Sequence, residues 1–249
     1  MMRSQQRQSN FGAALFTSVG VEGALGSAVA QKISEAITMG LIADGEQLPP
    51  ESDLAAQLAV STVSLRAALA ILRREGLLET RRGRHGGSFI RSPRDYTSAK
   101  STERLAAMSP SQLRDLGYEL MAVTGVVASL AARRFDEDNI ARLLELAGQL
   151  ASAELPEQRL SLDSRFRIEV AVTSQSERLT RRMVTLQAEY SDFLWLPAVG
   201  LDQVDCAAQH RDLAKAIQAG DAERARSLAE AHVADDTRHI LELRWGLDG

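Results

Sequence analysis

The chain has 249 residues, of which 45% are hydrophobic and 25% charged, and its formal net charge is −4. This composition is typical of a globular protein and excludes a disordered or fibrous chain. Cys206 is the single cysteine, which excludes an intramolecular disulfide, and no uninterrupted apolar run reaches the roughly 18 residues of a membrane span. We therefore expect a cytoplasmic protein of one large or two modest domains, without a membrane partner.

The charge is distributed unevenly along the chain. Eight arginines lie between residues 66 and 94, against only Glu75 and Glu79, whereas the part after residue 100 is acidic overall. A basic N-terminal part on an acidic chain indicates an anionic partner such as nucleic acid. A solvated basic surface without a partner would have the same composition. The pattern of helices and strands has to distinguish that surface from a site for nucleic acid.

Three helices are predicted near the N-terminus, after an extension over residues 1–20 that we expect to be flexible. Apolar periodicity, a proline suited to a first helical turn and Ser61 as an N-cap define these helices. Their ranges are about 26–39, 51–58 and 61–75. Two short strands over 77–81 and 88–90 follow, joined by a basic, glycine-rich loop. This order is that of a winged helix-turn-helix, which we place over residues 21–95.

A winged helix-turn-helix of this charge is suited to double-stranded DNA. A slim helix with small polar residues in its first turn can enter the major groove and reach the base edges. A basic hairpin with glycines can lie along the phosphates or reach into the minor groove.

The residues of this segment resemble the N-terminal domain of the GntR family of bacterial transcription regulators. The similarity rests on Leu48-Pro49-Pro50-Glu51-Ser52-Asp53-Leu54-Ala55, Leu58-Ala59-Val60-Ser61, Glu75-Gly76-Leu77-Leu78 and Gly86-Gly87-Ser88-Phe89-Ile90. In that family the start of the recognition helix contacts bases, its arginine contacts phosphate and the wing reads the minor groove. The resemblance implies DNA contacts by Ser61, Thr62, Val63, Ser64, Arg66, Arg82, Gly83 and Arg84.

Two positions depart from the family pattern. Ser52 and Thr62 stand where the family usually has arginine. Because arginine paired to guanine is the commonest specific contact, we expect a different preferred operator rather than a loss of binding. Arg66 remains available for phosphate, although it could instead belong to a surface ion pair.

The C-terminal part is predicted to be entirely helical, after a linker over residues 96–109. The expected helices are about 112–134, 140–153, 156–172, 177–196, 204–219 and 221–245. Six or seven helices of this length form an antiparallel bundle. The fold class is therefore mainly α, with the winged helix-turn-helix followed by an all-α effector-binding and dimerisation domain over 110–249.

This bundle resembles the FCD effector domain of the FadR subfamily, through His210-Arg211-Asp212-Leu213, Gly220-Asp221 and His232. Many FCD domains hold a divalent metal with an aspartate and three histidines. Asp163, His210 and His232 match that set, but Arg167 stands at the fourth position. Because a guanidinium repels a dication, we expect no cofactor, and a metal on the three matching residues is the less favoured alternative.

We expect Arg167 to take over part of the metal's task by binding the carboxylate of a small organic acid. Leu120 and Thr124 stand where family members often carry arginine and glutamate, which makes the expected pocket more apolar. The effector-binding residues implied by the resemblance are thus Asp163, Arg167, His210, His232, Leu120 and Thr124. Alternatively, Asp163 and Arg167 form a structural salt bridge and the histidines are satisfied interior residues.

The leading hypothesis is a DNA-binding transcription regulator, a repressor, that acts as a homodimer on a pseudo-palindromic operator and responds to an organic acid. We do not expect an enzyme, because no nucleophile motif or general base is visible. An architectural DNA-binding dimer without effector is the first alternative, and a metal-assisted hydrolase is the second.

Overall fold

The computed structural model describes residues 25–39, 41–42, 44–81, 83, 86–91 and 94–247. The chain divides into two compact units, Met1–Pro93 and Arg94–Gly249. The extension expected over residues 1–20 lies outside the described residues.

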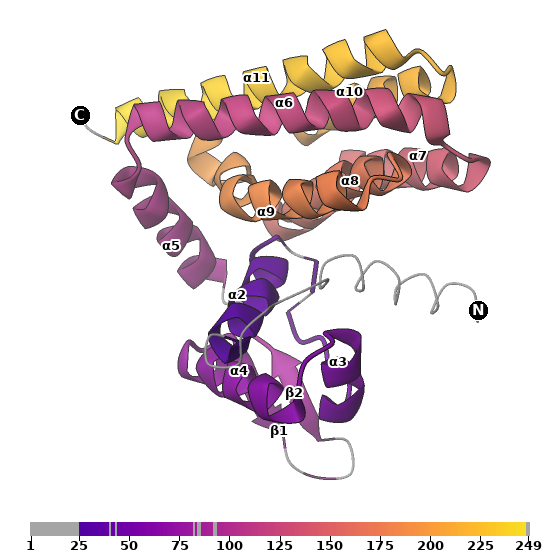
Figure 1. Ribbon diagram of the computed structural model, residues 1–249. Coiled ribbons are helices and arrows are strands. Elements are labelled where there is room, and N and C mark those ends of the chain that lie inside the picture. Colours follow the sequence, from indigo (N-terminus) through magenta and orange to yellow (C-terminus); the bar gives the residue numbers. More distant parts are fainter. Residues whose placement is uncertain are drawn as a thin grey trace. The chain divides into compact units, whose positions relative to one another are not determined.

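The N-terminal unit is a winged helix-turn-helix, as the sequence predicts. Its elements are α2 (Leu25–Thr38), α3 (Glu51–Gln57), α4 (Thr62–Arg74), β1 (Leu78–Arg81) and β2 (Gly87–Ile90) (Figure 1). Helices α2 and α3 both pack against α4. Apolar side chains from the helices and strands share one core, which includes Ile33, Leu54, Leu65, Leu72 and Ile90.

Helix α4 buries one face because its apolar residues recur at three- and four-residue spacing. Three leucines of this face are almost fully buried, namely Leu65, Leu69 and Leu72. The hydroxyl of Ser61 accepts a hydrogen bond from the backbone N–H of Ser64 at 3.0 Å, so Ser61 is the predicted N-cap. Gly76 follows the helix with a φ of 75°, a left-handed conformation that suits glycine. The opposite face of α4 is left exposed.

The wing is an antiparallel pair of strands in which Leu78 faces Ile90 and Arg81 faces Gly87. Arg73 of α4 donates from Nε to the hydroxyl of Thr80 at 2.9 Å. This bond joins the first strand of the wing to the last turn of α4.

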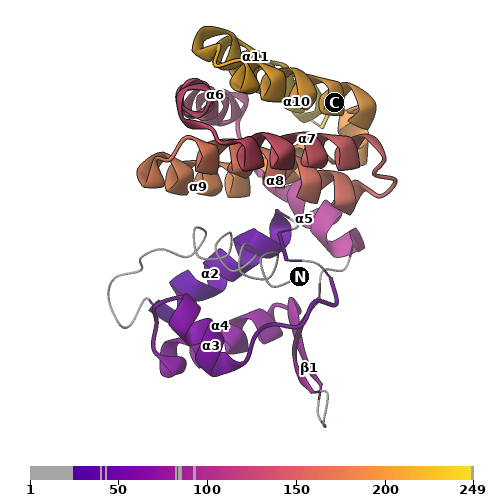
Figure 2. The ribbon, with the colours of Figure 1, turned by 90° about the vertical axis from the view of Figure 1, so that its right-hand side faces the viewer.

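The C-terminal unit consists of long helices, as the sequence predicts. They are α5 (Arg94–Ala107), α6 (Pro110–Arg134), α7 (Glu137–Ala151), α8 (Pro156–Thr173), α9 (Glu177–Leu194), α10 (Gln203–Gln218) and α11 (Ala222–Gly246), with a 3-10 turn at Pro197–Val199. Helices α6 and α11 lie side by side along almost their whole length, and α8 and α9 run beneath them (Figures 1 and 2).

The segment expected to be a linker over 96–109 is mostly helix α5. Leu105 anchors it in the core of the C-terminal unit. Ser101 and Arg104 both donate to Oδ2 of the buried Asp192 on α9, at 2.6 and 2.7 Å. These contacts order the segment, because they satisfy a carboxylate that would otherwise be buried without a partner.

Helix α6 is long and apolar enough to span a membrane by length and composition alone, although the sequence contains no uninterrupted apolar run of that length. Half of the most apolar stretch of this helix is buried inside the unit. Leu120, Val127 and Ala131 of this helix belong to the bundle core. Packing between helices therefore explains its apolar composition.

Two glycines of α6 allow α11 to approach closely. A Cβ added at Gly117 would lie 2.6 Å from Oγ1 and 3.2 Å from Cβ of Thr237, and one added at Gly125 would lie 2.7 Å from Cγ of Glu230. The hydroxyl of Thr237 donates to the carbonyl of Val233 at 2.7 Å, so this side chain is not free to turn away.

Gly117→Ala is expected to destabilise the protein, since overpacking costs about 1–3 kcal/mol whereas the gain in helix propensity is at most about 1 kcal/mol. Urea denaturation measures the difference. Gly148→Ala is the matched control, because no atom lies within 4 Å of a Cβ added at Gly148, and it should stabilise the protein. Equal effects of the two substitutions would contradict the close packing.

Candidate functional site

The start of α4 presents an exposed surface of small polar and apolar side chains. Thr62, Val63 and Arg66 are exposed, and Val63 is 74% exposed, which is unusual for a large apolar side chain. Ser61 and Ser64 are engaged with one another, with their hydroxyl oxygens 2.9 Å apart. Thr62 and Val63 are thus exposed in the first turn of α4, where the resemblance to the family implies contacts with bases.

Arg66 has an ion-pair partner within the N-terminal unit. Its Nε donates to Oε2 of Glu51 at 2.8 Å, and the two side chains are 69% and 39% exposed. This is the surface ion pair that the sequence leaves as an alternative, although it joins α4 to α3 rather than residues within one helix. An exposed pair of this kind contributes only about 0–1 kcal/mol, so a phosphate can replace Glu51.

The tip of the wing is only partly described. Arg82 and Arg84, which the resemblance assigns to DNA, lie outside the described residues, whereas Gly83 is described and has a φ of 112°. Along the strands of the wing Arg81 and Arg91 both donate to Glu79, and these bonds lower the pKa of that carboxyl. Part of the basic surface is thus neutralised internally.

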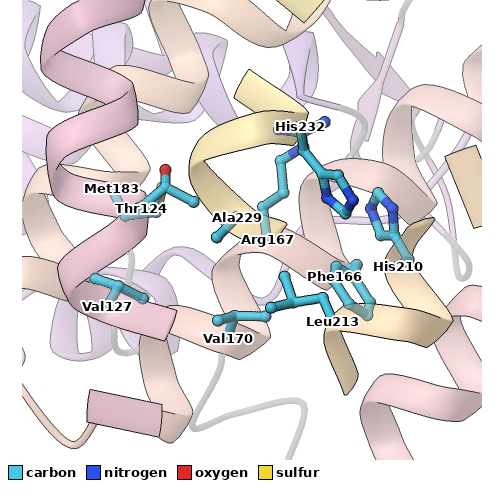
Figure 3. A pocket seen from close by; sticks show the side chains of 10 residues that line it. All are labelled: Thr124, Val127, Phe166, Arg167, Val170, Met183, His210, Leu213, Ala229 and His232. Atoms are coloured by element: carbon cyan, nitrogen blue, oxygen red, sulfur yellow. The ribbon is translucent and has the colours of Figure 1, made fainter. Parts of the chain in front are cut away.

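Four of the six residues expected to bind an effector come together from three helices of the C-terminal unit. Arg167 donates from Nε to Oδ1 of Asp163 at 2.9 Å, within α8. Nε2 of His210, on α10, lies 3.0 Å from the same oxygen, while Nδ1 is 2.8 Å from the carbonyl of Cys206. His232, on α11, stacks on His210 with ring centroids 6.1 Å apart (Figure 3).

Asp236 also belongs to this group, and sequence reasoning missed it. Its Oδ2 accepts a hydrogen bond from Nη2 of Arg167 at 2.7 Å. Asp236 follows His232 by four residues, so both lie on one face of α11, and this spacing was the available signal. Trp195 adds a longer bond of 3.4 Å from Nε1 to Oδ2 of Asp163.

Burial and charge act in opposite directions on the two carboxyls. Burial alone would raise the pKa of Asp163, but the charge of Arg167 holds it well below its ordinary value. Burial raises the pKa of Asp236, and Arg167 offsets this only in part. The charge of Arg167 thus outweighs burial at Asp163 but not at Asp236.

A small cavity lies beside the cluster. Its wall consists of Thr124, Val127, Phe166, Arg167, Val170, Met183, His210, Leu213, Ala229 and His232 (Figure 3). The volume is about 20 Å³, which is room for about one water molecule. Thr124 lines the cavity, whereas Asp163 and Leu120 do not, and Leu120 is buried in the bundle core. Any organic ligand therefore requires side chains to move.

The residues present do not fit a divalent metal. Arg167 occupies the fourth position of the expected ligand set and already binds the carboxylate of Asp163. Across the described ranges, no group of three or more His, Cys, Asp or Glu side chains is arranged to hold a metal ion. A guanidinium beside a dication adds a repulsion that this donor set does not offset.

His232 makes folding sensitive to acid. Burial, with the charges of His210 and Arg167, lowers its pKa from 6.5 to about 3. The unfolded chain therefore binds a proton near pH 6.5 that the folded protein rejects, and stability is lost as the pH falls from there toward 3. Between pH 7 and pH 5 this group alone should remove up to about 2 kcal/mol.

Urea denaturation at both pH values measures this loss, which should be smaller in His232→Gln. His239→Gln, on the same helix but outside the cavity wall, is the control and should retain the wild-type difference. An unchanged pH dependence in His232→Gln would contradict the assignment.

An exposed recognition helix, a wing and a separate helical unit define a DNA-binding protein of the winged helix-turn-helix class. The family model described as "Bacterial regulatory proteins, gntR family" matches residues 25–89, and that of the FCD domain matches residues 120–235. The chain belongs to the GntR family of transcription regulators and carries an FCD domain.

Relatives of known name agree with this assignment. RmpR of Mycobacterium gastri, named as a transcriptional regulator of the HTH type, is 38% identical over 220 residues, which cover 87% of this chain and 80% of that protein. A protein of Escherichia coli (strain K12) named for regulation of the L-lactate dehydrogenase operon is 32% identical and covers 84% of each chain. The structure of E. coli McbR/YncC shares the fold, with a TM-score of 0.53 at 17% identity over 92% of this chain and 100% of that one.

Proposed function

We propose that this transcription regulator binds a pseudo-palindromic operator as a homodimer in the cytoplasm and represses transcription. A small organic acid that binds beside Arg167 would change the affinity for the operator. Two-fold symmetric dimers read paired half-sites, so a ligand that alters the dimer alters binding.

The observation that carries the DNA contact is the exposed first turn of α4. Thr62 and Val63 have no role in the core, and Arg66 is held in place by a weak, replaceable partner. Phosphate contacts position a protein on DNA and base contacts specify the sequence, and we assign these tasks to Arg66 and to Thr62 with Val63.

The observation that supports an organic acid is the position of Arg167 in the cavity wall. Its hydrogen bonds to Asp163 and Asp236 use Nε and Nη2, and they leave other N–H donors of the guanidinium for a ligand carboxylate. His232 is neutral at pH 7, because burial lowers its pKa to about 3. The apolar wall suits a hydrocarbon group, and one relative is named for the operon of an enzyme that acts on such an acid.

Fluorescence anisotropy with a labelled fragment from upstream of the coding region tests the DNA part. We expect a sequence-selective shift that weakens with salt, and its absence would refute the proposal. Adding organic acids then tests the effector part. An active acid should both shift the DNA affinity and raise the melting temperature, and Arg167→Lys, which keeps the charge but loses the planar fork, should lose both effects.

One alternative, an architectural dimer without an effector, would give a different result: it would bind DNA but respond to no organic acid. We do not propose an enzymatic activity, because Asp163, the carboxylate that metal-assisted hydrolysis would need, is bound by Arg167.

A further inference from the structure

The ionic cluster of the C-terminal unit joins two helices through one guanidinium. Arg167 pairs with Asp163 on its own helix α8 and with Asp236 on α11, at 2.9 and 2.7 Å. All three residues are buried, at 9%, 1% and 5% exposure. Two buried carboxylates from different helices are therefore held by a single cation that the chain itself supplies.

The imidazoles of His210 and His232 lie beside this ion-paired group. His210 lies against Oδ1 of Asp163, the same oxygen that Arg167 binds, and the ring of His232 stacks nearly parallel on that of His210 at 14°. One oxygen of Asp163 thus faces both an imidazole and the guanidinium of Arg167. The guanidinium also reaches Asp236, so it supplies positive charge to carboxylates on two helices, as a bound cation would.

We propose that the guanidinium of Arg167 is the built-in cation of this domain, so that the protein folds and acts without a metal ion. It connects α8 to α11, the structural task that a metal bound to Asp163, His210 and His232 would perform. The position between Asp163 and Asp236 is filled by this cation in every molecule, because the guanidinium is part of the chain. The site is one substitution away from a metal centre.

Arg167→His tests this directly in the full-length protein. The variant would present one carboxylate and three imidazoles, with the first two ligands four residues apart on α8, so zinc should bind with a stoichiometry of about one per chain. After chelation the variant should melt below the wild type. Excess zinc should raise its melting temperature by roughly 5–10 °C. The wild type should melt at the same temperature with zinc, without it and after chelation.

Two controls assign the effect to this site. Arg167→Gln removes the charge without adding a metal ligand, so its lowered melting temperature should not respond to zinc. The double variant Arg167→His with His210→Ala should lose the zinc response of the single variant. Isothermal titration calorimetry with zinc measures the stoichiometry in each case.

Three results would overturn the proposal. One is stoichiometric metal in the purified wild type, with a melting temperature that falls on chelation; this measurement needs no variant. The second is a folded Arg167→His protein that binds no zinc, and the third is a zinc response that survives in the double variant. None of these measurements involves DNA or an effector, so the proposed function stands or falls separately.

Discussion

Arg167→Met is expected to lower the free energy of unfolding by about 3–5 kcal/mol, because removal of one partner leaves a buried charge uncompensated. The substitution preserves the length and the apolar stem of the side chain. It removes the ion-pair partner of two buried carboxylates, Asp163 and Asp236, which are 1% and 5% exposed. Urea denaturation at pH 7 measures the loss. A change below about 1 kcal/mol, the range of exposed pairs, would show that the cluster is solvated in solution.

A surface pair supplies the control for this experiment. Arg182 of α9 pairs with Glu119 of α6, and both side chains are almost half exposed. Arg182→Met should therefore cost less than about 1 kcal/mol. The double variant Arg167→Met with Asp236→Leu should recover part of the loss, because an apolar replacement removes one of the abandoned charges.

The second large effect is expected in DNA binding. Arg66→Ala should weaken binding to all sequences by about tenfold in the dimer and reduce the slope of log K against log salt concentration by about 2, since one phosphate contact is lost in each half-site. Fluorescence anisotropy at several salt concentrations measures both quantities. Arg224→Ala, which removes an exposed arginine at the start of α11, is the control and should change neither.

Thr62 should act on specificity rather than on overall affinity. Thr62→Arg restores the side chain that the family usually has at this position, and it should shift the preferred operator toward guanine by about 1–3 kcal/mol per half-site. Selection from a randomised DNA library before and after the substitution measures the shift. An Arg66→Ala variant that changed sequence preference, or a Thr62→Arg variant that did not, would reverse the roles assigned to these two residues.

The elements of the N-terminal unit could be predicted from the sequence because local signals define them. Ser61 caps α4, Gly76 follows it in a left-handed conformation, and leucines at helical spacing select its buried face. Helix α5 could not be predicted, since Leu105 is its main apolar anchor and its ordering depends on Asp192, far along the chain. Similarly, we expected the second helix of the bundle to start near residue 140, but α7 starts at Glu137, because Asp136 caps it and exchanges hydrogen bonds with Asn139.

The candidate site was only partly predictable for the same reason. The spacing of Asp163 and Arg167 identifies a pair on one helix, which requires no tertiary information. The bond from Arg167 to Asp236 joins residues 69 positions apart, and periodicity does not reveal such a partner. The volume of the cavity depends on ten side chains from several helices, so its small size is visible only in the packed structure.

The glycines of α6 limit how this domain can move. The side chains of Thr237 and Glu230 on α11 pack against Gly117 and Gly125 of α6, in the space that a Cβ atom would otherwise fill. A shift of α11 along α6 by one residue, about 1.5 Å, would drive both side chains into neighbouring Cβ atoms. Sliding of α11 along α6 is therefore expected to be costly. We expect the cavity to enlarge through its side chains and through α8, α9 and α10, and not through a shift between α6 and α11.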